Sequence, residues 1–174
     1  MDISLRKMID DSIQDYFELK SFLLTNGQVS QESFTTEVFR KFLLVSCASL
    51  FENQIQELIS LFISKQTDNT MIQNLIKRKV IERQYHTYFD WKNKNANPFY
   101  SLFGEEFKNT ISQKLKEKPE IKSAEKSFIE IGYERNLMVH ENFLGYQFNK
   151  TVEEVQALYN DALLYINFLQ EIFI

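Results

Sequence analysis

Residues 38–62 read VFRKFLLVSCASLFENQIQELISLF, and this most apolar stretch of the chain decides its fold class. Apolar side chains recur along it with the period of an α-helix, namely those of Phe39, Leu43, Leu50, Ile55, Leu58 and Phe62. A single long helix can bury such a stripe against several neighbours. The pattern therefore predicts a helix over about 33–65 that forms the spine of the core.

The composition of the whole chain also favours helices. Its 174 residues fit one domain. Four glycines and two prolines are too few for the many tight turns of a sandwich or barrel. Aromatic residues make up 14% of the chain, which is enough for a large core and excludes disorder of the whole chain. We therefore expect one all-α domain over residues 1–174, an antiparallel bundle of about five to six helices.

Helical periodicity continues on both sides of the central stretch. The further helices are expected over about 3–24, 70–84, 105–117, 119–140 and 152–173. In the first, Ile9, Ile13, either Tyr16 or Phe17, and Phe22 lie near one stripe. Two features of the sequence mark helix ends. Asn26-Gly27 suits the end of the first helix, and Pro119 suits the first turn of the helix over 119–140.

Polar side chains predict how two of the other helices begin. Either Asp68 or Asn69 is suited to cap the helix over 70–84. Thr151 and Glu154 have the spacing of a capping box before the last helix. Gly132 falls inside the helix over 119–140, where glycine costs about 1 kcal/mol relative to alanine. We therefore expect another backbone to approach that helix closely at Gly132.

Residues 85–104, which we call the insert, break the helical pattern. Several asparagines and Pro98 disfavour a regular helix. The seven aromatic residues of the segment indicate that it is packed rather than disordered. The sequence therefore predicts an irregular, aromatic and Asn-rich insertion with one short helix.

Charge and cysteine content limit the environment and the partners. The net charge is −4, which excludes a generally basic coat for nucleic acid but allows a local basic patch. The lone Cys47 lies in an apolar run and suits a core position in a reducing compartment. Residues 1–7 hold no uninterrupted apolar segment, and the run 42–51 is about half the length needed to span a bilayer. We expect a cytoplasmic protein that makes no membrane contact.

The common cofactor and metal motifs are missing from the sequence. Four scattered glycines form no phosphate-binding loop, and one cysteine with two distant histidines forms no zinc signature. We therefore expect no cofactor and no bound metal ion.

A basic segment with interleaved aromatic residues lies between Lys77 and Lys94. It holds six basic and two acidic residues. Cations that pair with phosphates and rings that stack on bases make a surface for single-stranded nucleic acid. The residues that predict such an RNA-binding surface are Lys77, Arg78, Lys79, Arg83, Tyr88 and Trp91. The alternative is that the rings belong to the core and the charges only face solvent. The role of His86 within this segment stays open.

The end of the helix over 119–140 carries a second polar group. Asn136 and His140 are four residues apart and share a helix face, and the long side chain of Arg135 can reach the same cleft. Imidazole can transfer protons near neutral pH, and guanidinium can hold phosphoryl oxygens. The alternative is structural, because a histidine in the last turn of a helix also favours the helix dipole.

These residues resemble a known protein family. Arg135 to His140, RNLMVH, is similar to the Arg-x4–6-His motif of HEPN domains, which are α-helical bundles with this motif late in the chain. Residues 49–55, SLFENQI, and the stretch from Trp91 through NPFYSLFG at 97–104 also resemble the subgroup RiboL-PSP-HEPN. The resemblance covers about 35–170.

The resemblance implies a metal-independent endoribonuclease. His140 would activate the ribose 2′-hydroxyl or protonate the leaving oxygen, Arg135 would stabilise the phosphorane, and Asn136 would orient the phosphate or the histidine. The products would carry a 2′,3′-cyclic phosphate and a 5′-hydroxyl. Glu52 and Glu141 are further candidates for the cleft.

The resemblance also implies partners. The substrate would be RNA, two copies would pair so that both motifs face a shared cleft, and the protein would act as a toxin or anti-phage effector with an antitoxin or sensor protein. One departure is that Asn142 stands where some HEPN toxins carry a tyrosine that receives AMP, so we do not expect that form of regulation. The competing interpretation is a HEPN-like module that binds RNA or protein, or dimerises, without cleavage.

Overall fold

The computed structural model describes residues 3–143 and 145–173, and in these residues the chain is built of helices. They are α1 (Ile3–Thr25), α2 (Val29–Gln66), α3 (Thr70–Ile76), the π-helical segment η1 (Lys77–Ile81), α4 (Tyr85–Tyr88), α5 (Asn97–Ser101), α6 (Glu105–Glu117), α7 (Pro119–His140) and α8 (Val152–Phe173). The described part of the chain holds no strand, only an isolated bridge between Asp90 and Asn95. The predicted all-α class is confirmed. Two short helices of the insert, α4 and α5, raise the number in the described residues above the five to six expected.

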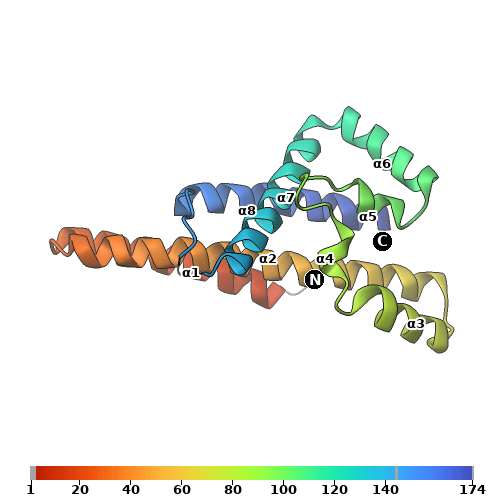
Figure 1. The fold of residues 1–174 in the computed structure, drawn as a ribbon, viewed down its shortest axis with the longest axis horizontal. Helices are drawn as coiled ribbons and strands as arrows, with labels where there is room; N and C mark the ends of the chain where they lie inside the picture. The colour runs from red at the N-terminus through yellow and green to blue at the C-terminus, as the bar shows by residue number, and fades with distance from the viewer. Residues whose placement is uncertain (1–2, 144, 174) are drawn as a thin grey trace.

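Helix α2 is the spine of the molecule, as predicted. Its 38 residues extend over about 57 Å at 1.5 Å per residue. In Figure 1, α1 runs back along one end of α2, the short α3 folds back at the other end, α8 lies alongside the middle of α2 and α7 crosses it. None of the helices in the described segments is long and apolar enough to span a bilayer.

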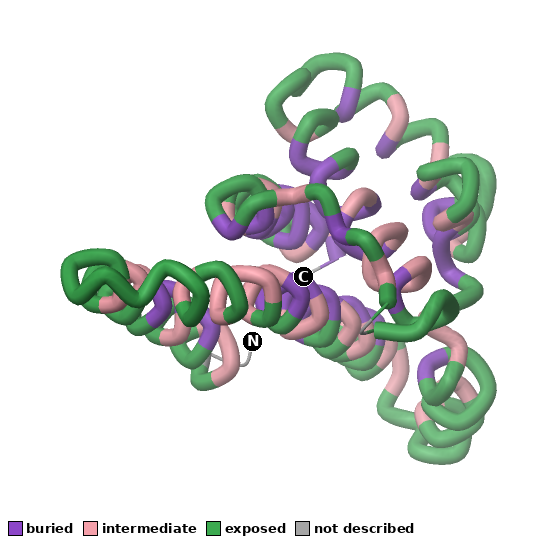
Figure 2. Tube along the Cα trace, turned by 60° about the vertical axis from the view of Figure 1, so that its left-hand side comes forward, coloured by how far each residue is buried: buried purple, intermediate pink, exposed green. Residues whose placement is uncertain are grey.

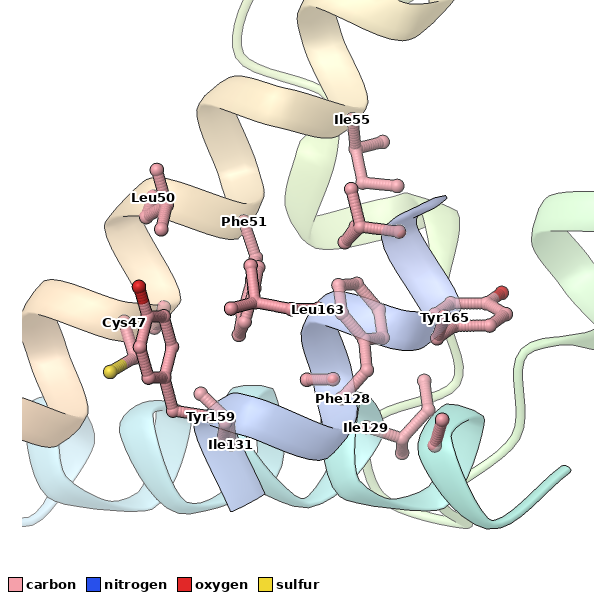
Figure 3. Close-up of a cluster of buried hydrophobic side chains, with 14 of the residues drawn as sticks. Cys47, Leu50, Phe51, Ile55, Phe128, Ile129, Ile131, Tyr159, Leu163 and Tyr165 are labelled. Atoms are coloured by element: carbon pink, nitrogen blue, oxygen red, sulfur yellow. The ribbon is translucent and has the colours of Figure 1, made fainter. Parts of the chain in front are cut away.

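The core lies where α2, α7 and α8 meet. Figure 3 shows Phe51 of α2, Phe128 of α7 and Leu163 of α8 pointing into a common centre. The ring of Phe51 is 5.7 Å from that of Phe128 and 6.0 Å from that of Tyr159, measured between centroids. Burying one such aromatic side chain stabilises the fold by about 1.5–3 kcal/mol. This packing fixes α7 on α2 and so fixes the helix that carries the motif.

Helices α1 and α2 form a hairpin that extends beyond this core. The chain turns at Gly27, whose φ of 68° is in the left-handed region that glycine favours. Tyr16 stacks on Phe39 at 4.4 Å and is buried, together with Ile9 and Ile13, as predicted. The prediction for Phe22 is wrong, because its side chain is 63% exposed. The reason is visible in Figure 2, where the tip of the hairpin projects away from the other helices and is exposed on its surface.

The helix predicted over 70–84 is shorter than expected. Asn69, rather than Asp68, is its cap, because the Asn69 side chain accepts hydrogen bonds from the backbone N–H groups of Met71 and Ile72. The helix then widens into η1 and ends at Ile81. Arg83 follows with a φ of 62°, which turns the chain towards the insert.

The insert contains two short helices, α4 and α5, where one was predicted. Between them, Asp90 and Asn95 exchange two backbone hydrogen bonds of 3.0 and 2.9 Å, which close a tight loop. Phe89 and Phe99 are buried and stack at 5.0 Å between centroids. The prediction of an irregular but packed insertion is confirmed.

The last two helices have the predicted bounds. Thr151 and Glu154 form the predicted capping box at the start of α8. The Thr151 N–H donates to the Glu154 carboxylate at 2.7 Å, and the Glu154 N–H donates to the Thr151 hydroxyl at 3.1 Å. Helix α7 ends at His140, and the N–H of Glu141 donates to the carbonyl of Leu137 at 2.9 Å.

Candidate active site

A small recess lies where α2, α4 and α7 meet. Its polar lining residues are Glu52 of α2, His86 of α4, and Arg135 and Asn136 of α7. Aromatic residues, among them Tyr85 and Trp91, form much of the rest of its wall. Its volume is about 10 Å³, the room of about one water molecule. The recess is therefore too small to enclose a phosphodiester group.

Helix α7 places the motif residues. Gly132, Asn136 and His140 follow one another at intervals of four residues and so lie on one face of the helix. Arg135 and Asn136 are half-buried, and the guanidinium of Arg135 donates from Nη1 to the Asn136 side-chain oxygen at 3.0 Å. This hydrogen bond orients both side chains at the recess.

His140 lies outside the recess. It is exposed, in the last turn of α7, about 6 Å along the helix axis from Asn136. Glu141, the next residue, is also exposed and does not line the recess. The structure thus brings Glu52, Arg135 and Asn136 together, with His140 one turn further along and Glu141 away from them.

The pKa of the Tyr85 hydroxyl depends on the charges that surround the recess. Burial raises the pKa of its hydroxyl, the charge of Glu52 raises it further, and the charge of Arg135 lowers it. The hydroxyl therefore stays protonated at neutral pH and can donate a hydrogen bond. A carboxylate, a guanidinium and a neutral hydroxyl thus lie close together at the recess.

Trp91 packs against α7 beside the recess. A Cβ atom added to Gly132 would lie 2.1 Å from Cζ3 of the Trp91 ring. The close neighbour of Gly132 is therefore an indole ring and not the backbone that we expected. The indole Nε1–H of Trp91 donates to the backbone carbonyl of His86 at 3.1 Å. Trp91 thereby links α4 to α7.

The basic segment is exposed, but its rings are not free. Lys77, Arg78, Lys79 and Arg83 all face solvent. Tyr88 is only 3% exposed, and its hydroxyl donates to the carbonyl of Val80. The prediction that Tyr88 offers a ring to a base is therefore wrong, because the ring belongs to the core. Trp91 is half-buried, with Gly132 against it.

His86 is the residue that the motif did not reveal. It lines the same recess as Arg135 and Asn136, and it is exposed. It comes from a segment without helical periodicity, 49 positions before Arg135 by their numbers in the chain. The spacing of His86 and Arg135 in the sequence therefore did not predict that they are close. Only the packing of the insert on α7 brings the two residues together.

Groups of three or more histidine, cysteine, aspartate or glutamate side chains that could hold a metal ion do not occur in residues 3–143 and 145–173.

The comparison with protein families identifies the class. A model of the family RiboL-PSP-HEPN matches residues 10–174. The chain therefore belongs to the RiboL-PSP-HEPN family, and the match begins earlier than the 35–170 expected, so that it includes most of α1. No curated protein and no solved structure matches the chain.

Proposed function

We propose that this protein is a metal-independent endoribonuclease. The observation that carries the proposal is the arrangement on α7: Arg135 and Asn136 line the recess, and His140 is exposed one turn further along the same helix. Membership of the RiboL-PSP-HEPN family supports it.

The proposed reaction is attack by the ribose 2′-oxygen on the adjacent phosphorus. His140 takes the proton from the 2′-hydroxyl or gives one to the leaving 5′-oxygen, since imidazole titrates near neutral pH. Arg135 holds two phosphoryl oxygens with its guanidinium and stabilises the charge of the phosphorane. Asn136, already bonded to Arg135, keeps that guanidinium oriented. Glu52 and Tyr85 complete the polar environment of the recess.

Incubation with mixed RNA in the presence of EDTA tests this proposal. The wild type should cleave, and Arg135→Ala and His140→Ala should each lower the rate by about 10²–10⁴-fold, the typical contribution of one proton-transfer or oxyanion-stabilising group. Glu141→Ala is the matched control, because Glu141 follows His140 but is exposed outside the recess. Cleavage that persists in both motif variants would contradict the proposed roles.

We propose that two copies pair so that their motifs face a shared cleft. The exposure of His140 at the end of α7 suits such a cleft. The hairpin of α1 and α2 also leaves large apolar side chains exposed, among them Phe22 and Phe34. Light scattering at micromolar concentration should therefore give the mass of a dimer, and a stable, fully active monomer would contradict the shared cleft.

The exposed cations of η1 are the proposed contact for the RNA backbone. Reversing the charges of Lys77, Arg78 and Lys79 should weaken RNA binding for all sequences and flatten its dependence on salt, because fewer counterions are released. Reversal of Lys114 and Lys116, which are exposed on α6 after the insert, is the control. An unchanged affinity and salt slope after reversal in η1 would refute this assignment.

A second candidate function is RNA binding without cleavage. The distance of His140 from the recess lined by Arg135, and the very small volume of that recess, favour this alternative. A wild type that binds RNA but leaves it intact in EDTA and in Mg²⁺ would support a binding or dimerisation module.

We also propose a biological setting: a cytoplasmic toxin or anti-phage effector, restrained by an antitoxin or triggered by a sensor protein. This rests on the family and on the proposed chemistry. Expression of the wild type should arrest bacterial growth, and expression of His140→Ala to the same level should not. Equal growth with both chains would contradict a toxic nuclease.

A further inference from the structure

We infer that His86 is a second proton-transfer residue of this site and that it comes from the same chain as Arg135 and His140. The inference rests on the proposed RNA cleavage and adds the identity of the second group.

The reaction needs two proton transfers. As the 2′-oxygen bonds to phosphorus, one imidazole takes the hydroxyl proton, and as the bond from phosphorus to the 5′-oxygen breaks, an imidazolium gives that oxygen a proton. The motif on α7 provides one imidazole per chain. In the proposed shared cleft a second copy would bring its own His140, whereas His86, the other histidine of the same chain, already lines the recess with Arg135.

The structure places His86 beside the phosphate-binding residues of the proposed site. His86 lines the recess with Glu52, Arg135 and Asn136, although it is far from them in sequence. It is exposed, so a substrate at the mouth of the recess can reach it. His140 lies one turn along α7 from Asn136, at the end of the helix, and does not line the recess. A phosphate held by Arg135 thus has one histidine at the recess and one at the end of the helix.

The insert is fixed to α7 at two points, which keeps His86 in register with the motif. Trp91 packs on Gly132 and its indole N–H holds the backbone carbonyl of His86 at 3.1 Å. Lys94 forms an ion pair with Glu130, and its ammonium lies 4.2 Å from the centre of the Tyr133 ring. Gly132, Glu130 and Tyr133 all belong to α7, within two turns of Arg135. Both contacts attach the segment after His86 to the helix that carries the motif.

Charged and polar groups from three helices line the recess with His86. They are the carboxylate of Glu52 on α2, the guanidinium of Arg135 on α7 and the neutral hydroxyl of Tyr85 on α4.

The pH dependence of cleavage tests the inference. Two imidazoles give a bell-shaped profile of kcat/KM for the wild type. His86→Gln should lower the rate by about 100-fold or more and should remove one limb of the profile. The matched control is Thr87→Ala on the same short helix, since Thr87 is exposed and does not line the recess. A His86→Gln enzyme with the wild-type rate and both limbs would overturn the inference.

A substrate with an activated leaving group shows which proton His86 moves. The probe is uridine 3′-(p-nitrophenyl phosphate), whose leaving group needs no proton. If His86→Gln recovers most of the wild-type rate on this probe, His86 is the acid. If the rate stays low while His140→Ala recovers, His86 is the base. A loss on both substrates with an unchanged pH profile would indicate a structural role only and would overturn the inference.

Mixing variants tests whether the two histidines act within one chain. His86→Gln mixed with His140→Ala should stay as inactive as either alone, because neither chain has both groups. Restored cleavage would overturn the placement in one chain. Failure of the inference is distinct from failure of the proposed function: in the first case the wild type cleaves RNA and His86 proves dispensable, and in the second the wild type itself cleaves no RNA.

Discussion

The core of α2, α7 and α8 and the insert of residues 85–104 are both rich in buried aromatic rings, yet they are held in different ways. In the core, Phe51 and Phe128 lie on long helices whose apolar stripes meet, and the backbone hydrogen bonds lie within each helix. In the insert, short helices and a two-residue bridge leave the chain dependent on side-chain contacts with α7, among them those of Trp91 and Lys94. The core therefore fixes the position of α7, which carries Arg135 to His140. The insert determines which side chains lie beside these residues.

The largest expected effect comes from the core. Phe51 is 1% exposed, and Phe51→Ala should lower the free energy of unfolding by about 3–5 kcal/mol because it removes a ring between α7 and α8. Urea denaturation followed by circular dichroism measures the change. Phe34→Ala on the same helix is the control, since Phe34 is 70% exposed and should change stability by less than about 0.5 kcal/mol. Similar losses for both would mean that α2 is not the spine of the core.

The contact between Trp91 and Gly132 should give the next largest effect. Replacing a mid-helix glycine by alanine ordinarily stabilises a helix by about 1 kcal/mol. Here the added Cβ would lie 2.1 Å from the indole ring, so Gly132→Ala should destabilise by about 1–3 kcal/mol. It should also shift the fluorescence of Trp91, the one tryptophan of the chain.

A double-mutant cycle isolates that contact. In a Trp91→Leu background the smaller side chain leaves room, so Gly132→Ala should cost much less than in the wild type. If Gly132→Ala stabilised the wild-type chain, the packing of the insert on α7 would be refuted.

The capping box of α8 should have a smaller effect, since it involves one helix end. Thr151→Ala removes the hydroxyl that accepts from the Glu154 N–H and should lower the free energy of unfolding by about 1 kcal/mol. Thr151→Ser keeps the hydroxyl and should retain most of the stability. Thermal unfolding of the two variants distinguishes them, and equal losses would exclude the cap as the cause.

The smallest effect should be the response of the insert to acid. Burial alone would raise the pKa of Glu130, but hydrogen bonds from Lys94 and Lys150 outweigh it and hold this pKa below its usual range. A lowered pKa means that the link is complete above about pH 4.3, the value for free glutamate, and is lost as the pH falls through the lower value of the folded protein. Partly exposed ion pairs contribute less than about 1 kcal/mol, so the insert should loosen without global unfolding.

Trp91 fluorescence against pH measures this step. The wild type should show a change in the acidic range that Glu130→Gln lacks. Glu117→Gln on α6 is the control, because Glu117 is exposed and distant from Lys94 and Lys150. An identical titration in wild type and Glu130→Gln would refute the link.

Helical periodicity and capping residues predicted where the long helices lie, because these features depend on residues within or next to each helix. The bounds of α7 and α8 follow from Pro119 and the Thr151 capping box, which act within a few residues of the helix end. The same pattern failed for Phe22, since a helical stripe does not reveal that the hairpin tip extends beyond the other helices. Tyr88 was misassigned because an aperiodic segment gives no sign of which rings turn inward.

In the candidate site, too, positions within one helix could be predicted and contacts between distant segments could not. The spacing of Asn136 and His140 placed them on one face of α7. Glu52, a candidate for the cleft in the sequence, lines the same recess as Arg135. His86 and the ring of Trp91 could not be placed, because their positions depend on contacts between segments far apart in the chain.

The ends of the cleavage products test the central claim most directly. A short RNA of defined sequence, incubated with the wild-type protein in EDTA, is examined by mass spectrometry. Attack by the 2′-oxygen, assisted by Arg135 and His140, predicts fragments with a 2′,3′-cyclic phosphate and a 5′-hydroxyl, and no such fragments with His140→Ala. Fragments with a 3′-hydroxyl and a 5′-phosphate, or RNA that stays intact, would contradict the account.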